Sequence, residues 1–142
     1  MIRKARVLDT GRVGAILSEF IDITDWMPRI HSRAEDISFA GIMIDRDWVH
    51  VFENMEITGF IARDQNMIHS LYVTASARQK GIGKALLNHA KSISHELTLW
   101  TFVANENAQK FYKSAGFNEV ERTDGAGNDE NLPDIRFYWT QE

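Results

Sequence analysis

Apolar positions along the first third of the chain recur at helical spacing. A strand-like segment at residues 2–5 precedes the first predicted helix, which Asp9 or Thr10 can cap. A second helix begins at the capping-box pattern of residues 32–35 and is expected to run to about Ile44. The apolar stripe of the first helix consists of Val13, Ile16, Leu17, Phe20 and Ile21.

The middle of the chain changes to strand-like runs. Short polar turns separate three of them, which predicts antiparallel hairpins at residues 48–53, 57–63 and 67–73. An amphipathic helix follows, with its apolar face formed by Ile82, Leu86, Ala90 and Ile93. Residues 97–103 form an apolar, β-prone run that is typical of a buried central strand.

The last third predicts one helix and a closing hairpin. The helix covers residues 105–115 and ends at Gly116, which suits a left-handed cap. The hairpin strands are expected at 117–123 and 135–140, and their connection, 124–133, is rich in Gly, Asn and Asp and is expected to be mobile. The element order predicts an α/β (α+β) fold with a mixed sheet of about seven strands and about four helices.

Composition limits the classes of function. With 142 residues, 44% hydrophobic and 25% charged, the chain is expected to form one domain, 1–142. Its net charge of −4 argues against nucleic-acid binding and is compatible with a cationic or amine substrate. Cysteine is absent, which excludes disulfides, cysteine-thiolate metal sites and an acyl-cysteine intermediate. This absence also fits a reducing, cytoplasmic location. Neither a membrane-spanning run nor the apolar core of a signal peptide is present, so no membrane partner is expected.

The segment 71–87 carries the strongest chemical signal. A β-like run enters a polar loop, and Gly81 and Gly83 open an amphipathic helix whose first N–H groups lack partners. Arg78, Lys80 and Lys84 add positive charge. We therefore expect a pyrophosphate site, although a simple glycine-containing turn would use the same residues.

Two common phosphate motifs do not match this loop. The Walker pattern is absent, and the dinucleotide fingerprint fails because Leu86 stands where Gly or Ala is needed. The pattern Arg/Gln-x-x-Gly-x-Gly/Ala does match, at residues 78–83. This loop resembles the pyrophosphate loop of the GNAT superfamily, the acetyl-CoA-dependent N-acyltransferases.

A second motif strengthens the resemblance. Residues 105–117 are similar to the superfamily pattern Asn-x-x-Ala-x-x-Phe-Tyr-x-x-x-Gly-Phe, and residues 2–9 resemble its first strand and helix entry. The end of the chain, 124–136, resembles a bacterial subgroup whose acceptors are not named. The resemblance implies a mostly antiparallel twisted sheet that splits between its fourth and fifth strands, and it implies acetyl-CoA as co-substrate.

The resemblance also implies positions for the cofactor. The pantetheine arm would pair with the backbone of Leu71 and Val73, and the diphosphate would lie on the N–H groups of residues 79–84. Asn105 falls on the family's Asn, although it or Asn107 could be only a helix cap. The full set of expected cofactor-binding residues is Leu71, Tyr72, Val73, Arg78, Gln79, Lys80, Gly81, Ile82, Gly83, Lys84, Asn105, Asn107 and Phe111.

Tyr112 falls on the family's usual general acid, which would protonate the departing thiolate; its alternative role is core packing. The general base is less evident, because some relatives carry a glutamate where this chain has Met67. His69 is the expected base, and strand alternation would point its side chain to the same side as Met67 and Leu71. A structural His69, or proton loss through water, is the alternative. Weaker candidates for the base are Glu53, His50 and His31.

The loop between the first two helices is expected to shape the acceptor pocket through Trp26, Met27 and His31, unless it folds onto the core as a lid. The five histidines show no metal-ligand spacing, so no metal is expected. The sequence therefore predicts an N-acetyltransferase acting on a small-molecule or peptide amine by direct transfer, with a homodimer possible. Two alternatives stay open: a non-catalytic acyl-CoA-binding sensor, and another phosphate-ligand enzyme, which the failed fingerprints disfavour.

Overall fold

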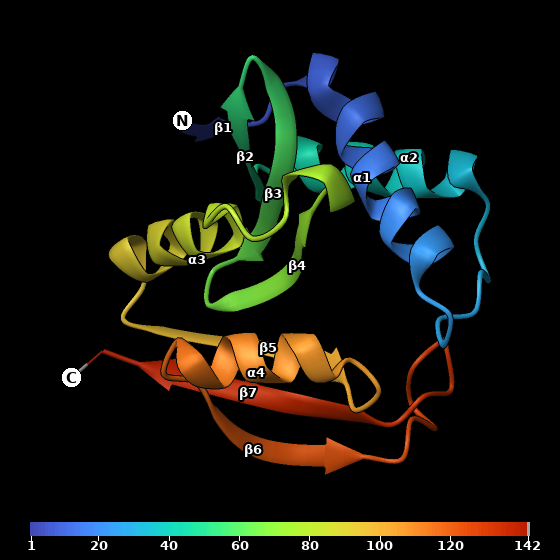
Figure 1. Ribbon diagram of the computed structural model, residues 1–142, viewed down its shortest axis with the longest axis vertical. Coiled ribbons are helices and arrows are strands. Elements are labelled where there is room, and N and C mark those ends of the chain that lie inside the picture. Colours follow the sequence, from blue (N-terminus) through green and yellow to red (C-terminus); the bar gives the residue numbers. More distant parts are fainter. Residues whose placement is uncertain (142) are drawn as a thin grey trace.

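The computed structural model describes residues 1–141, which form a seven-stranded sheet with four helices on its two faces (Figure 1). The strand order is β1-β2-β3-β4-β5-β7-β6, and every neighbouring pair is antiparallel except β4 with β5. The predicted fold class and element order are confirmed. The strands are β1 (Ile2–Lys4), β2 (Val49–Asn54), β3 (Glu56–Asp64), β4 (Met67–Val73), β5 (Glu96–Phe102), β6 (Asn118–Thr123) and β7 (Asp134–Thr140). The helices are α1 (Thr10–Ile23), α2 (Arg33–Asp45), α3 (Ile82–Ile93) and α4 (Glu106–Ser114), with short 3₁₀ turns at Val7–Asp9 and Ala75–Ala77.

The sheet divides between β4 and β5, as expected. These strands pair over two positions only, Met67 with Thr98 and Ile68 with Leu99, and then diverge (Figure 1). Beyond Ile68 the edge of β4 that faces β5 has no ladder partner. An open strand edge of this kind presents backbone donors and acceptors to a ligand.

A β-bulge interrupts β4 beside this division. Ser70 pairs with Ala62 and Ile68 pairs with Arg63, so His69 is one extra residue opposite the continuous strand β3. A bulge breaks the strict alternation of side chains between the two faces of a sheet. Residues on either side of His69 therefore do not keep the parity that an uninterrupted strand would give.

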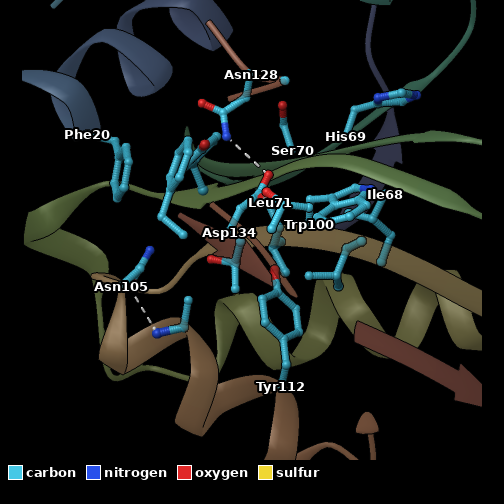
Figure 2. A pocket seen from close by; sticks show the side chains of 17 residues that line it. Phe20, Ile68, His69, Ser70, Leu71, Trp100, Asn105, Tyr112, Asn128 and Asp134 are labelled. Atoms are coloured by element: carbon cyan, nitrogen blue, oxygen red, sulfur yellow. Dashed lines mark hydrogen bonds between the residues drawn. The ribbon is translucent and has the colours of Figure 1, made fainter. Parts of the chain in front are cut away.

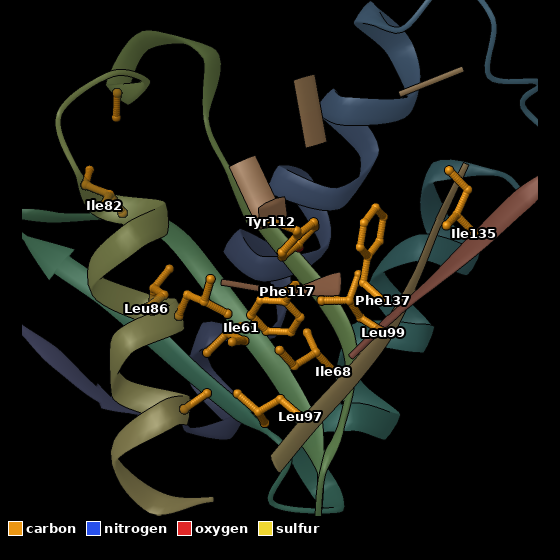
Figure 3. Close-up of a cluster of buried hydrophobic side chains, with 13 residues drawn as sticks. Ile61, Ile68, Ile82, Leu86, Leu97, Leu99, Tyr112, Phe117, Ile135 and Phe137 are labelled. Atoms are coloured by element: carbon orange, nitrogen blue, oxygen red, sulfur yellow. The ribbon is translucent and has the colours of Figure 1, made fainter. Parts of the chain in front are cut away.

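Two hydrophobic clusters hold the helices against the two faces of the sheet. The cluster in Figure 3 lies between α3, α4 and the sheet, and its largest fully buried members include Leu86, Phe117 and Phe137. The second cluster packs α1 and α2 against the opposite face through Val13, Met43 and Phe60, among others. Burial of each of these side chains contributes about 1.5–3 kcal/mol.

Local signals at the helix ends behave as predicted, with one correction. The Ser32–Glu35 capping box forms with both reciprocal bonds, and Gly116 adopts φ +92° after α4. Asp9 precedes α1 but makes no side-chain cap. Its carboxylate instead accepts hydrogen bonds from the Arg3 guanidinium and from the Arg6 backbone N–H, because the 3₁₀ turn at Val7–Asp9 turns it toward β1.

The expectation of a fully buried β5 is wrong. Leu97 and Leu99 are buried, but Trp100 is 39% exposed and Glu96 is also exposed. The strand lies centrally in the sheet, yet only one of its faces is covered by a helix, because its other face borders the space opened by the divergence from β4. Within residues 1–141, no helix combines the length and apolar character that crossing a membrane requires.

Gly14 allows α1 and α2 to pack closely, and this generates a prediction. A Cβ on Gly14 would lie 2.7 Å from the Ile37 Cα, whereas one on Gly11 of the same helix meets nothing within 4 Å. We expect Gly14→Ala to lower the free energy of unfolding by about 1–3 kcal/mol, because backbone must shift to admit the methyl group. Gly11→Ala should be neutral or slightly stabilising. Chemical denaturation of both variants measures the difference, and equal stabilities would contradict close helix contact at Gly14.

Candidate active site

Two cavities lie side by side where the sheet divides, each of about 520 Å³. We call the first the fork cavity; it is bounded by β4, β5 and the β6–β7 connection and includes His69, Trp100 and Asp134 (Figure 2). The second, the loop cavity, is bounded by the α1–α2 loop, the start of α3 and the start of α4, and includes Trp26 and Arg78. Five residues line both: Phe20, Leu71, Asn105, Ala108 and Tyr112.

The loop cavity brings together both sequence motifs. Arg78 and Gly83 come from the glycine loop, and Asn107 and Phe111 come from α4. A Cβ on Gly83 would lie 3.6 Å from the Phe111 ring and 3.8 Å from a methyl group of Val73, so the start of α3 lies against both α4 and β4. Three segments distant in sequence therefore converge on one groove.

The glycine loop presents free backbone donors beside this groove. Gln79 and Gly81 adopt positive φ, +64° and +80°, and Gly81 is the N-cap of α3. Among residues 1–141, no acceptor contacts the backbone N–H groups of residues 79–84. Free N–H groups at the positive end of a helix dipole favour an anion such as a phosphate. Lys80 and Lys84 are exposed on the same turn.

Asn105 serves as a helix cap and also faces both cavities. Its Oδ1 accepts a hydrogen bond of 3.1 Å from the Ala108 N–H, which is the ordinary N-cap bond of α4. Asn105 nevertheless lines both the fork and the loop cavity. Asn107, two residues further on, is exposed and lines only the loop cavity. Asn105 therefore caps α4, which is one of the two roles that the sequence left open for it.

Tyr112 stands in the common wall of the two cavities. Its ring is 7% exposed and packs edge-on against Phe111 and Phe117, at centroid distances of 5.1 and 5.5 Å. Tyr112 borders both cavities, and Figure 2 shows its hydroxyl directed into the fork cavity. Burial, with a smaller contribution from Tyr72, raises the pKa of the Tyr112 phenol above its ordinary value. The group is thus a protonated phenol near neutral pH.

Tyr72 contributes packing from the other face of β4. Its ring lies 4.7 Å from that of Phe20 and 5.9 Å from that of Phe60. Burial, aided by the charge of Glu130, raises the pKa of Tyr72 to about 12. Tyr72 lines the fork cavity, whereas its neighbour Val73 lines the loop cavity.

His69 also borders the fork cavity, but on a different face from the one expected. Its imidazole stacks on Trp48 at a centroid distance of 4.6 Å, and Trp48 packs against the cluster beneath α1 and α2. Leu71 packs against the opposite cluster, beneath α3. The expectation that His69 and Leu71 share a side is wrong, because the bulge at His69 shifts the alternation by one residue. Burial lowers the pKa of His69, with Asp64 opposing this and Arg46 adding to it.

The weaker base candidates line neither cavity. Glu53 forms an ion pair with Arg3 at 2.8 Å, and His50 packs against His89 with ring centroids 4.6 Å apart. His31 Nδ1 lies 3.6 Å from a carboxylate oxygen of Glu35.

The three residues expected in the acceptor pocket separate in space. Trp26 lines the loop cavity, and its ring contacts Phe102 of β5 edge-on at 5.7 Å, so the α1–α2 loop reaches across the divided sheet. Met27 and His31 line neither cavity. Arg29 holds this loop, because its guanidinium bonds to Asp22, to Asp36 and to Ser18.

Sequence reasoning missed the polar side of the fork cavity. Ser70, Trp100, Asn128 and Asp134 all line it, and the last two come from the β6–β7 connection and the start of β7 (Figure 2). The only sequence signal was the Asn- and Asp-rich composition of that connection. The structure gives it a defined shape, in which the Asn128 side chain bonds to the Leu132 carbonyl oxygen and N–H at 2.8 and 3.2 Å.

Acidic and imidazole side chains in the described part of the chain do not gather into a metal-binding cluster of three or more.

Residues 41–119 match the sequence profile of a family described as the acetyltransferase (GNAT) domain. That match covers more than half of the chain and includes β4, the glycine loop, α3 and α4. The chain belongs to the GNAT acetyltransferase family. Members of this family transfer an acyl group from acetyl-CoA, and the chain is accordingly an N-acetyltransferase.

Relatives within the GNAT family span most of the chain. A peptidyl-lysine N-acetyltransferase, YjaB, of Salmonella typhimurium is 32% identical over 126 residues, covering 87% of this chain and 86% of that protein. The YjaB protein of Escherichia coli is 29% identical over 125 residues, covering 87% and 85%. The solution structure of apo YjaB from Escherichia coli has the same fold, with a TM-score of 0.82 at 24% identity over 100% of this chain and 98% of that one. The structure of the Salmonella typhimurium protein YncA with its cofactor acetyl-CoA has a TM-score of 0.76 at 18% identity, covering 100% of this chain and 94% of that one.

Proposed function

We propose that residues 1–142 act as one domain that transfers the acetyl group of acetyl-CoA directly to a primary amine, and that the amine is a lysine side chain of a peptide or protein. The observation that carries the proposal is the placement of Tyr112 in the common wall of two adjacent cavities. The free N–H groups of the glycine loop lie beside one cavity, where Gly83 lines the wall, and such groups suit a diphosphate. The other has space and polar groups for an acceptor, and the relatives named above are peptidyl-lysine N-acetyltransferases.

The cofactor would follow the loop cavity. Its diphosphate would accept hydrogen bonds from the N–H groups of residues 79–84, with Arg78 supplying charge from the cavity wall. Its pantetheine arm would pair with the open edge of β4 near Leu71 and Val73. This path would bring the thioester to the fork beside Tyr112.

The chemistry then needs three proton movements: the ammonium loses one proton before the attack, its nitrogen loses a second after the attack, and the leaving thiolate gains one. The amine nitrogen, after losing a proton, would attack the thioester carbonyl carbon, and collapse of the tetrahedral intermediate would break the C–S bond. Tyr112 would donate its phenolic proton to the departing thiolate, and the second proton lost by the nitrogen would return Tyr112 to the phenol. The chain has no cysteine, so no acyl-cysteine intermediate forms and both substrates would be bound together during transfer.

His69 is the proposed acceptor of the amine proton. It borders the fork cavity, and its lowered pKa keeps the imidazole neutral near pH 7, in the form that takes up a proton. Its stacking on Trp48 is also compatible with a structural role, so water remains the competing route.

One observation favours a second candidate function. Met67 occupies the strand position where some relatives carry a glutamate, which fits a non-catalytic acyl-CoA sensor. Cofactor binding by calorimetry without thiol release across a panel of amines, lysine peptides included, would support the sensor and contradict the enzyme. The cytoplasmic location, the homodimer and the lack of nucleic-acid partners stay predictions.

Arg78 provides a test of the cofactor path. We expect Arg78→Gln to weaken acetyl-CoA binding about tenfold, because the change removes a charge-assisted contact to phosphate. Isothermal titration calorimetry measures the dissociation constant. Lys110→Gln is the matched control, since Lys110 is exposed on α4 and lines neither cavity. If the two variants bind acetyl-CoA alike, the diphosphate does not lie beside Arg78.

Tyr112→Phe separates packing from proton donation. The ring and its contacts remain, so acetyl-CoA affinity should stay within about twofold while kcat falls about 10²-fold, the lower range for loss of a general acid. Thiol release under saturating substrates measures kcat. Tyr138→Phe serves as control, because Tyr138 donates to Glu96 and lines neither cavity. Wild-type turnover in Tyr112→Phe would remove the acid role from Tyr112.

His69→Gln tests the base through the pH profile. Since burial lowers the pKa of His69, kcat/KM of the wild type should rise with pH through an inflection below the ordinary value of about 6.5. In His69→Gln this inflection should vanish and the rate at neutral pH should fall by about 10²-fold. The comparison is His50→Gln, whose imidazole packs against His89 away from both cavities. An unchanged profile in His69→Gln would assign deprotonation to water.

A further inference from the structure

Asp134 is an acidic group in the fork cavity that the chemistry above does not use. It is the first residue of β7, it pairs with Phe102 of β5, and its side chain lines the cavity (Figure 2). This position lies on the far side of the divided sheet from β4, opposite the strand that carries His69. A charge here would face an acceptor that enters between the two halves of the sheet.

Neutral donors hold the Asp134 carboxylate in place. The Thr123 hydroxyl donates to one carboxylate oxygen, and the Asn128 amide donates to the other at 3.2 Å. Asn128 is itself fixed by its two bonds to Leu132, described above. Because hydroxyl and amide donors carry no charge, they orient the carboxylate without neutralising it.

In the described part of the chain, no cation forms an ion pair with this carboxylate. The ion pairs found among residues 1–141 involve other carboxylates, and no Lys, Arg or His nitrogen lies within 4.0 Å of Asp134. A carboxylate that faces a cavity and lacks a counter-ion favours a cationic ligand.

The rest of the cavity wall suits the alkyl stem of such a ligand. Aromatic rings from three elements surround the space, namely Phe20, Tyr72, Trp100 and Phe102. Aromatic faces attract cations and also pack well against methylene chains. An unbranched alkylammonium therefore matches both the apolar wall and the single charged group.

We propose that Asp134 determines acceptor specificity by binding the ammonium group of a lysine side chain, so that the fork cavity selects the cation over the same carbon chain without an ammonium group. Asn128 and Thr123 are positioning residues for this carboxylate. The inference deepens the proposed function and rests on it for the identity of the cavity as the acceptor site.

The test compares two ligands whose backbone ends are both uncharged, Nα-acetyl-lysine methylamide and Nα-acetyl-norleucine methylamide. Only the lysine derivative carries a side-chain ammonium group. Their affinities for the CoA-saturated protein are measured by NMR titration, without any need for turnover. In the wild type the lysine derivative should bind about ten- to a hundredfold more tightly, the range for a charge-assisted hydrogen bond. Asp134→Asn keeps the side-chain shape and should abolish this preference while leaving norleucine affinity unchanged.

A matched variant controls for general electrostatics. Asp129→Asn removes the same charge from the β6–β7 connection that precedes Asp134, but Asp129 is exposed and does not line the cavity. It should keep most of the preference for lysine, and Asp134→Glu should retain it in part because the charge remains. Raising the salt concentration provides a measure that needs no variant, since lysine affinity should fall while norleucine affinity does not.

Three results would overturn the inference: equal binding of the two ligands to the wild type, an undiminished preference in Asp134→Asn, or the same loss in Asp129→Asn. Failure of the proposed function has a different signature. The wild type would then bind the lysine derivative selectively yet release no thiol from acetyl-CoA with any amine.

Discussion

The separation of β4 from β5 after two paired residues determines most of what this protein can do. Parallel strands in a closed sheet satisfy each other's backbone groups, and no ligand can enter between them. Here the edge of β4 beyond Ile68 stays open, and the two cavities occupy the space that full pairing would have closed. Helix α4 packs near the division, which places Tyr112 between the cavities.

Close packing of the elements around this division serves binding as well as stability. The start of α3 approaches β3 so tightly that a Cβ on Gly59 would lie 3.0 Å from Ile82 and 3.2 Å from the Tyr72 carbonyl oxygen. That approach fixes the direction in which the free N–H groups at the start of α3 point. The same helix start contacts Phe111 across Gly83. A rigid arrangement of donors avoids the entropic cost of ordering them when an anion binds.

Charge is distributed unevenly around the site. The chain carries a net charge of −4, yet the glycine loop places Arg78, Lys80 and Lys84 together. The acidic group Asp134 lies instead at the fork cavity. Local positive charge thus matches an anionic cofactor, and local negative charge matches a cationic acceptor. The negative net charge of the protein alone would indicate only the cationic acceptor.

The sequence alone determined the features that depend on neighbouring residues. Helical and strand periodicity, the Ser32–Glu35 capping box and the two motifs at 78–83 and 105–117 placed every helix and strand within a few residues. The positions of Tyr112 and of the glycine loop were available for the same reason, because each motif is contiguous.

Tertiary structure decided what depends on register and on contacts between distant segments. The bulge that turns His69 away from the side of Leu71 arises from the pairing of β4 with β3. The alternation of apolar and polar residues in β4 does not predict it. Asp9 bonds to Arg3 rather than capping α1, and Trp100 is exposed because β5 leaves β4. Asp134 enters the fork cavity only because β7 pairs with β5 and brings the connection after β6 to the fork. Hydrogen bonding between strands acts across the chain, and a local pattern of residue types carries no information about which distant side chain will face a cavity.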